Sequence, residues 1–145
     1  MEISDFLAPS QVVINRHASD KGHLLDHLAR RAAVALDLPY EMILSALLKR
    51  EELGSTGTGY GVAVPHARLL GVSKPFGMLA CLSEAIDFAA IDIVCVLLLL
   101  TNSDEGQHAL ACAARVLRDP EALRNIRQAA DTTEAYRALV GQRSA

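Results

Sequence analysis

Residues 93–100 read IVCVLLLL, an unbroken run of eight apolar side chains. A strand with one solvated face alternates apolar and polar residues, whereas a strand covered on both faces does not. The run is also far shorter than the ~20 residues that a membrane-spanning helix needs. We therefore expect a central strand here, with helices packed on both faces of its sheet, and no membrane insertion.

Other segments with strand character alternate along the chain with segments of helical character. The remaining strand candidates are Val12–Ile14, Val62–Val64 and Phe76–Leu82. Such alternation is typical of layered α/β architectures, and the length suits one domain. The sequence predicts a three-layer α/β/α fold with a small mixed sheet, as a single domain over residues 1–145.

Capping residues indicate where the expected helices begin and end. The candidate N-caps are Ser19 or Asp20, then Asn102, Ser103 or Asp104, then Asp119 before Pro120, and Asp131 with Glu134 in a capping box. A further helix runs from Pro39 to a terminating Gly54, and the last helix ends at Gly141. The expected core-facing residues are Leu24, Leu28, Ala32, Ala35, Ile43, Ala46, Leu47, Leu110, Ala113, Ala114 and Leu117.

The composition excludes several classes of protein. Hydrophobic residues make up 51% of the chain and charged residues 21%, as in a folded globular domain. The formal net charge is −3 and the 14 Lys and Arg residues are scattered, so we expect no nucleic-acid partner. The three cysteines lack C-x-x-C spacing and the first residues lack a signal-peptide pattern. We therefore expect a cytoplasmic protein with free thiols.

The segment GSTGTGYGVAVPHAR, residues 54–68, concentrates glycine directly before a histidine. Glycine lets a ligand approach the main chain closely. Pro65 suits a strand end, so His66 is expected at the mouth of the sheet. Neither the phosphate-loop nor the dinucleotide-binding pattern matches this segment. The alternative is that the segment is a simple turn and that His66 is a surface histidine without a functional role.

Two more residues are expected near His66. Arg50 ends the helix before the glycine segment, and His108 lies in the first turns of the helix after the central strand. A helix N-terminus favours an anion, and arginine binds phosphate through two parallel hydrogen bonds. The set suits a doubly charged phosphoryl group. A zinc site of His66, His108 and Cys112 is a weaker alternative, and we expect no metal or other cofactor.

The stretches REELGSTGTGYGVAVPHAR (50–68), IDFAAID (86–92) and HALACAARVLRD (108–119) together resemble a known family. It is the enzyme IIA domain of the fructose/mannitol type of the phosphoenolpyruvate:sugar phosphotransferase system, and within it the nitrogen-regulatory branch. The resemblance implies a mixed five- or six-stranded sheet flanked by helices. Asp92 leads almost directly into the central strand, which implies a shortened hairpin near the pocket.

The resemblance also implies roles for individual residues. His66 would accept the phosphoryl group on Nε2, giving a tele-phosphohistidine, while a backbone carbonyl holds its Nδ1–H. His108 and Arg50 would stabilise the phosphoryl oxygens. Further hydrogen bonds to the phosphate would come from the loop residues Ser55, Thr56, Gly57 and Gly59.

The implied activity is that of a phosphotransferase. An HPr-like phosphocarrier protein of the nitrogen branch (NPr) would phosphorylate the chain, whose phosphorylation state would then regulate target proteins. One alternative is a sugar-permease enzyme IIA that passes the group to a fructose or mannitol enzyme IIB. Another is a binding module without transfer. The sequence shows no fused IIB or membrane domain, which favours the regulatory carrier, and the intact His66, His108 and Arg50 argue against the binding module.

Overall fold

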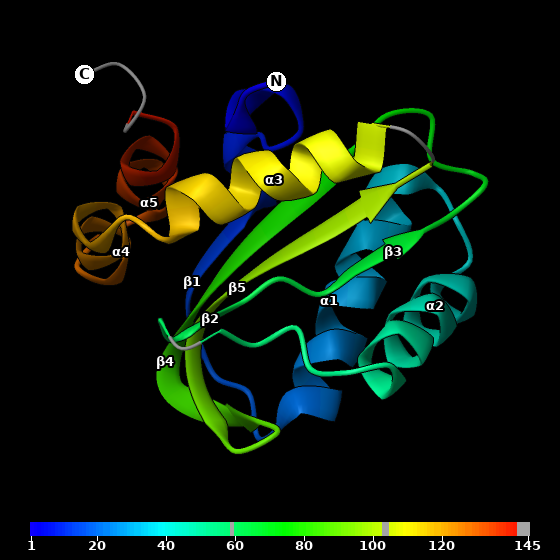
Figure 1. The fold of residues 1–145 in the computed structure, drawn as a ribbon, viewed down its shortest axis with the longest axis horizontal. Helices are drawn as coiled ribbons and strands as arrows, with labels where there is room; N and C mark the ends of the chain where they lie inside the picture. Colours follow the sequence, from blue (N-terminus) through cyan, green and yellow to red (C-terminus); the bar gives the residue numbers. More distant parts are fainter. Residues whose placement is uncertain (59, 103–104, 142–145) are drawn as a thin grey trace.

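The structure is a computed structural model that describes residues 1–58, 60–102 and 105–141. These residues form a mixed sheet between two layers of helices (Figure 1). The strands are β1 (Val12–Arg16), β2 (Val62–Ala63), β3 (His66–Arg68), β4 (Phe76–Phe88) and β5 (Ile91–Thr101). The helices are α1 (Lys21–Leu36), α2 (Tyr40–Glu52), α3 (Glu105–Leu117), α4 (Pro120–Arg127) and α5 (Thr132–Val140), and two short 3₁₀ turns cover Ile3–Asp5 and Pro9–Gln11.

The sheet has the order β1-β4-β5-β2, and β3 also pairs with β5. β1 runs parallel to β4, β4 antiparallel to β5, and both β2 and β3 parallel to β5. The prediction of a three-layer fold with a small mixed sheet is confirmed. The expectation of a single domain over residues 1–145 stays a prediction.

The central strand is buried on both faces, as its unbroken apolar run predicts. Cys95, Leu97 and Leu99 pack with α3, α4 and α5 in one core cluster. The alternate residues Val96, Leu98 and Leu100 pack with α1 and α2 in the other. Each strand residue points opposite to its neighbour, so both sets must be apolar when both faces are covered. None of the described helices is both long and apolar enough to cross a bilayer.

The helix boundaries follow the capping residues. The Asp20 carboxylate accepts a hydrogen bond from the His23 amide at 2.8 Å, and Asp119 and Asp131 cap α4 and α5 in the same way. Gly54 follows the C-cap of α2 with a φ of +145°, which favours glycine. Of the candidate caps of α3, Ser103 and Asp104 lie outside the described residues.

Two details of the helix prediction are wrong. Ala35 is exposed, because Leu36, four residues after Ala32, takes the core-facing position in the last turn of α1. The capping box at α5 is only half formed, since Glu134 accepts its hydrogen bond from the Ala130 amide. The expected bond from the amide of Asp131 is replaced by one from the residue before it.

The edge of the sheet beside β5 is built from two short strands in line. The expected strand Val62–Val64 ends at Ala63, and the chain pairs with β5 again from His66 to Arg68. Between them, the Pro65 carbonyl accepts a hydrogen bond from the Leu99 amide at 2.9 Å. Proline has no N–H to donate, so it is suited to this outer edge. Because of this break, His66 is the first residue of β3, at the outer edge of the sheet.

β4 and β5 are longer than the sequence predicts and form a hairpin. Ala89 and Ala90 join them with φ values of +54° and +71°, the backbone sign that a two-residue type I′ turn requires. The hairpin lies at the bottom of Figure 1, whereas β3 lies at mid-height on the right. Neither alanine lines the cavity beside His66, so the expectation of a hairpin near the pocket is not supported.

Candidate active site

The ring of His66 is held in a defined orientation. Its Nδ1 lies 2.8 Å from the carbonyl oxygen of Val64. A carbonyl oxygen only accepts hydrogen bonds, so Nδ1 carries the hydrogen and Nε2 carries a lone pair. Val64 is itself fixed by its amide, which donates to the Thr56 carbonyl at 3.1 Å. The backbone around the edge-strand break therefore sets which nitrogen of His66 is available to react.

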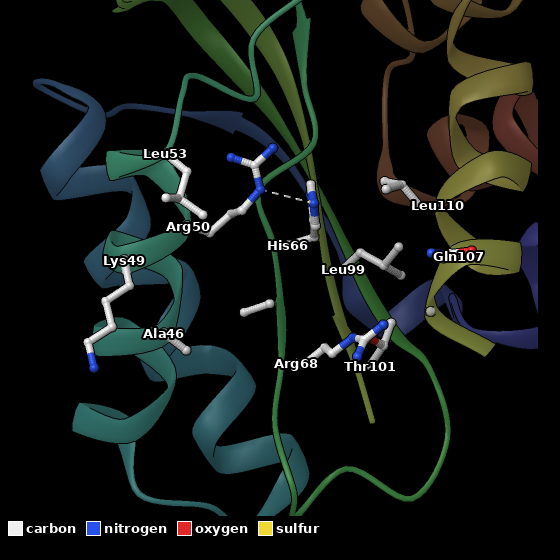
Figure 2. Close-up of a pocket in the computed structure, with 12 residues that line it drawn as sticks. Ala46, Lys49, Arg50, Leu53, His66, Arg68, Leu99, Thr101, Gln107 and Leu110 are labelled. Atoms are coloured by element: carbon white, nitrogen blue, oxygen red, sulfur yellow. Dashed lines mark hydrogen bonds between the residues drawn. The ribbon is translucent and has the colours of Figure 1, made fainter. Parts of the chain in front are cut away.

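Arg50 stands directly against that nitrogen. It lies in the last turn of α2, and its Nε–H donates to His66 Nε2 at 3.3 Å (Figure 2). Its Nη1 donates to the Gly54 carbonyl at 2.9 Å. One N–H edge of the guanidinium is thus anchored to the end of α2, while the positive charge of Arg50 lies beside the lone pair of His66 Nε2.

Glu51, the neighbour of Arg50, ties the glycine-rich loop to two helices. Its side chain is 6% exposed and pairs with Lys21 Nζ of α1 at 2.6 Å. The Thr56 hydroxyl donates to the same carboxylate, and the Thr56 amide lies 3.3 Å from it. The Lys21 ammonium also lies 4.7 Å from the centre of the Phe88 ring. This buried network holds the start of the loop against the end of α2.

The loop residues expected to bind phosphate are engaged in the loop itself. Ser55 Oγ accepts from the Gly57 amide at 3.0 Å, and Thr56 is bound to Glu51. A Cβ on Gly57 would lie 3.2 Å from Phe88 Cβ, so the glycine allows close packing there. None of Ser55, Thr56 and Gly57 lines the cavity beside His66. Gly59 lies outside the described residues.

A cavity of about 520 Å³ opens beside His66, between α2 and α3 (Figure 2). Its floor is formed by His66 and Arg68 of β3 with Leu99 and Thr101, their register partners on β5. The wall on α2 consists of Ala46, Lys49, Arg50 and Leu53, and the wall on α3 consists of Gly106, Gln107 and Leu110. Among the described lining residues there are three cations, Lys49, Arg50 and Arg68, and no carboxylate.

The structure brings Arg50 to His66 but does not bring His108 there. His108 is exposed on α3 and does not line the cavity. Successive helix residues are rotated by about 100°, so His108 lies about 160° round the helix from Leu110, which faces the cavity. His108 lies in the first turns of α3 as predicted, but its side chain lies on another face of the helix than the one that lines the cavity.

The zinc alternative is not supported by the structure. Cys112 is 3% exposed in the core cluster under α3, whereas His108 points to the surface. Within the part of the chain that the structure describes, no group of three or more His, Cys, Asp or Glu side chains is arranged to hold a metal ion.

The polar residues Arg68 and Gln107 are among the cavity residues that were not predicted. Arg68 follows His66 by two positions, and residues two apart on a strand share a face. That spacing would have identified Arg68, had His66–Arg68 been predicted as a strand. For Gln107, the signal is its helical spacing from Leu110.

Comparison with known proteins agrees with this fold. The sequence profile of the family "Phosphoenolpyruvate-dependent sugar phosphotransferase system, EIIA 2" matches residues 5–141. The nitrogen regulatory protein of Bradyrhizobium diazoefficiens is 36% identical over 96% of this chain and 95% of its own. The crystal structure of the nitrogen regulatory protein IIA-Ntr from Neisseria meningitidis superposes with a TM-score of 0.87 at 24% identity, covering 94% of this chain and 98% of that one.

A second solved structure extends the likeness of fold to a sugar-transport protein. The mannitol enzyme IIA of Escherichia coli, in complex with phosphorylated mannitol enzyme IIB, superposes with a TM-score of 0.80 at 18% identity, covering 93% of this chain and 97% of that one. The profile match spans nearly the whole chain, and the curated relative is matched along nearly its full length. The chain therefore belongs to the EIIA 2 family of the phosphoenolpyruvate-dependent phosphotransferase system.

Proposed function

We propose that this chain is a phosphohistidine carrier of the nitrogen-regulatory branch of the phosphotransferase system, with His66 as the phosphoryl acceptor. The observation that carries the proposal is the pair of contacts on the imidazole. Val64 holds Nδ1–H and leaves the lone pair of Nε2 beside the guanidinium of Arg50, at a cavity lined by cations. A preorganised positive charge at the position of developing negative charge is the main catalytic need of phosphoryl transfer.

The transfer is an in-line exchange between two imidazoles. The lone pair of His66 Nε2 forms the new P–N bond as the P–N bond to the donor histidine breaks. The electron pair of the broken bond returns to the donor ring. Each ring keeps the hydrogen on its other nitrogen, so no net proton transfer is required. The Arg50 guanidinium neutralises charge on the transferring group, and the backbone hydrogen bond at Nδ1 keeps the ring in line.

The surroundings of the cavity suit a protein donor. Leu53 on its rim is 84% exposed, so a protein donor would bury this apolar side chain when it covers the cavity. An HPr-like carrier of the nitrogen branch is the proposed donor. The phosphoryl group adds up to two negative charges at this surface, which is how phosphorylation would control docking to cytoplasmic target proteins.

The experiment mixes the purified chain with phosphoenolpyruvate, enzyme I and the HPr-like carrier, and reads the intact mass. The wild type should gain one acid-labile phosphoryl group and His66→Ala none. His108→Ala is the matched histidine control and should be phosphorylated like the wild type. If the wild type gains nothing while a known enzyme IIA in the same mixture is labelled, the proposal is wrong.

A sugar-transport carrier is the second candidate, because the mannitol enzyme IIA neighbour is solved in complex with its phosphorylated enzyme IIB. Adding a fructose or mannitol enzyme IIB to the phosphorylated chain separates the two functions. Loss of the phosphoryl group to the IIB protein supports sugar transport. Its retention supports the regulatory carrier.

A further inference from the structure

Arg68 is a cation on the floor of the cavity, and the phosphoryl transfer proposed above does not involve it. It shares a face of β3 with His66, two residues away, where strand geometry separates the Cα atoms by about 6.6 Å. Its register partner on β5 is Thr101, which also lines the cavity. Figure 2 shows the Arg68 side chain beside Thr101, on the same floor as His66.

Within residues 1–58, 60–102 and 105–141, no hydrogen bond or ion pair engages the Arg68 guanidinium. By contrast, Arg16, Arg30, Arg50 and Arg127 each donate a hydrogen bond to a neighbouring group. Arg68 therefore has its planar set of donors available to an anion in the cavity.

The other walls of the cavity do not supply enough positive charge to balance a phosphoryl group on His66. A phosphoryl group on histidine carries up to two negative charges, and Arg50 supplies one positive charge. Lys49 lines the cavity with its stem, but its ammonium end is turned away from His66 in Figure 2. The described residues of the α3 wall, Gly106, Gln107 and Leu110, carry no charge.

The α3 wall is also packed too tightly at its start to hold a larger side chain. A Cβ added to Gly106 would lie 2.7 Å from Oγ1 of Thr101, a residue that is 5% exposed. The glycine lets the first turn of α3 rest directly on the floor, next to Arg68. Positive charge on this side of the cavity therefore comes from the strand.

We propose that Arg68 is the second phosphoryl-contacting cation of this chain, in a role that rests on the proposed function. In the phosphorylated protein its guanidinium binds oxygens of the group on His66 Nε2, opposite Arg50. An extended arginine side chain spans a length comparable to the separation of the two residues, so the contact requires a rotamer change and no backbone movement. Planar guanidinium donors match phosphoryl oxygens in pairs.

The test compares Arg68→Gln with Arg118→Gln, an exposed arginine of the same chain that lies after α3 and away from the cavity. We expect Arg68→Gln to slow phosphorylation by the HPr-like carrier about 10- to 100-fold, with Arg68→Lys in between and Arg118→Gln unchanged. Thermal unfolding should be the same for all four proteins. Wild-type rates in Arg68→Gln would overturn the inference.

A second measurement separates contact with the phosphoryl group from contact with the donor protein. The ¹⁵N-arginine-labelled chain is phosphorylated and freed of the carrier, and its side-chain Nε–H signals are compared with those before phosphorylation. The Arg68 signal should move and the Arg118 signal should not. If Arg68→Gln is slow but the Arg68 signal stays in place, Arg68 serves donor docking and the inference is wrong. If the wild type takes up no phosphoryl group, the proposed function itself has failed.

Discussion

The buried carboxylate of Glu51 allows a quantitative prediction, since it joins α1, α2 and the glycine-rich loop. Glu51→Gln keeps the shape of the side chain and removes its charge. Removing one partner of a buried ion pair costs about 3–5 kcal/mol. Lys21 is 25% exposed and keeps the Phe88 ring as a neighbour. We therefore expect a smaller loss, about 2–3 kcal/mol of the free energy of unfolding.

Urea unfolding followed by circular dichroism measures this loss. For a chain of this length the corresponding fall in Tm is about 5–10 °C. Glu52→Gln is the matched control, because Glu52 is the next residue of α2 and is exposed. It should change the free energy of unfolding by less than about 0.5 kcal/mol. Equal stability of the two variants would refute the argument.

A double-mutant cycle tests the same reasoning at the level of the pair. Lys21→Met keeps an apolar stem against Phe88 and removes the ammonium that Glu51→Gln leaves unpaired. The double variant should therefore be more stable than the sum of the two single changes predicts. Strict additivity would mean that Lys21 and Glu51 do not interact in solution.

Three further predictions concern the backbone and a partly buried imidazole. Replacing Ala89-Ala90 by Asn-Gly should raise the free energy of unfolding by about 1 kcal/mol in urea titrations, because both residues have positive φ. Gly61→Ala should lower it by about 1–2 kcal/mol, since φ is +80° and the new Cβ would lie 2.6 Å from Arg127 Nη2. Burial lowers the pKa of His27 below its ordinary 6.5. Just below pH 6.5 the unfolded chain therefore binds more protons than the folded chain, and the free energy of unfolding should decrease as the pH falls. In urea titrations at pH 5 to 7, His27→Gln should make this decrease smaller.

The parts of the fold that the sequence predicts are those governed by local patterns. The apolar run at 93–100 is the central strand, because a strand covered on both faces needs apolar residues at every position. Asp20, Asp119 and Asp131 cap helices because each carboxylate satisfies an amide within its own first turn. Gly54 ends α2 because the chain turns there with a positive φ.

The strand β3 escaped prediction because its partner is distant in sequence. His66, Ala67 and Arg68 show no strand pattern, and they pair with β5 only because that strand extends to Thr101 and presents an unpaired edge. The same non-local pairing places Arg68 in the cavity. The two-residue spacing of His66 and Arg68 indicates a shared face only once this segment is known to be a strand.

The pairing of His66 with Arg50 could be predicted from the sequence, whereas the positions of the surrounding residues could not. The glycine-rich loop and the end of α2 bring Arg50 to His66, and both lie within one local stretch of chain. The direction of His108 depends on how α3 is rotated against the sheet, which is set by packing of its buried residues. Thr56 was expected to face a phosphate, but the Glu51 carboxylate is the nearer partner and holds it.

The most direct test of the central claim is to identify which atom carries the phosphoryl group. The chain, labelled with ¹⁵N in its histidine rings, is phosphorylated by the HPr-like carrier and examined by ¹H–¹⁵N correlation with ³¹P coupling. We predict ³¹P coupling to Nε2 of His66, with Nδ1 still bonded to its hydrogen as the Val64 contact requires. A phosphoryl group on Nδ1, or on any other residue, would contradict the account.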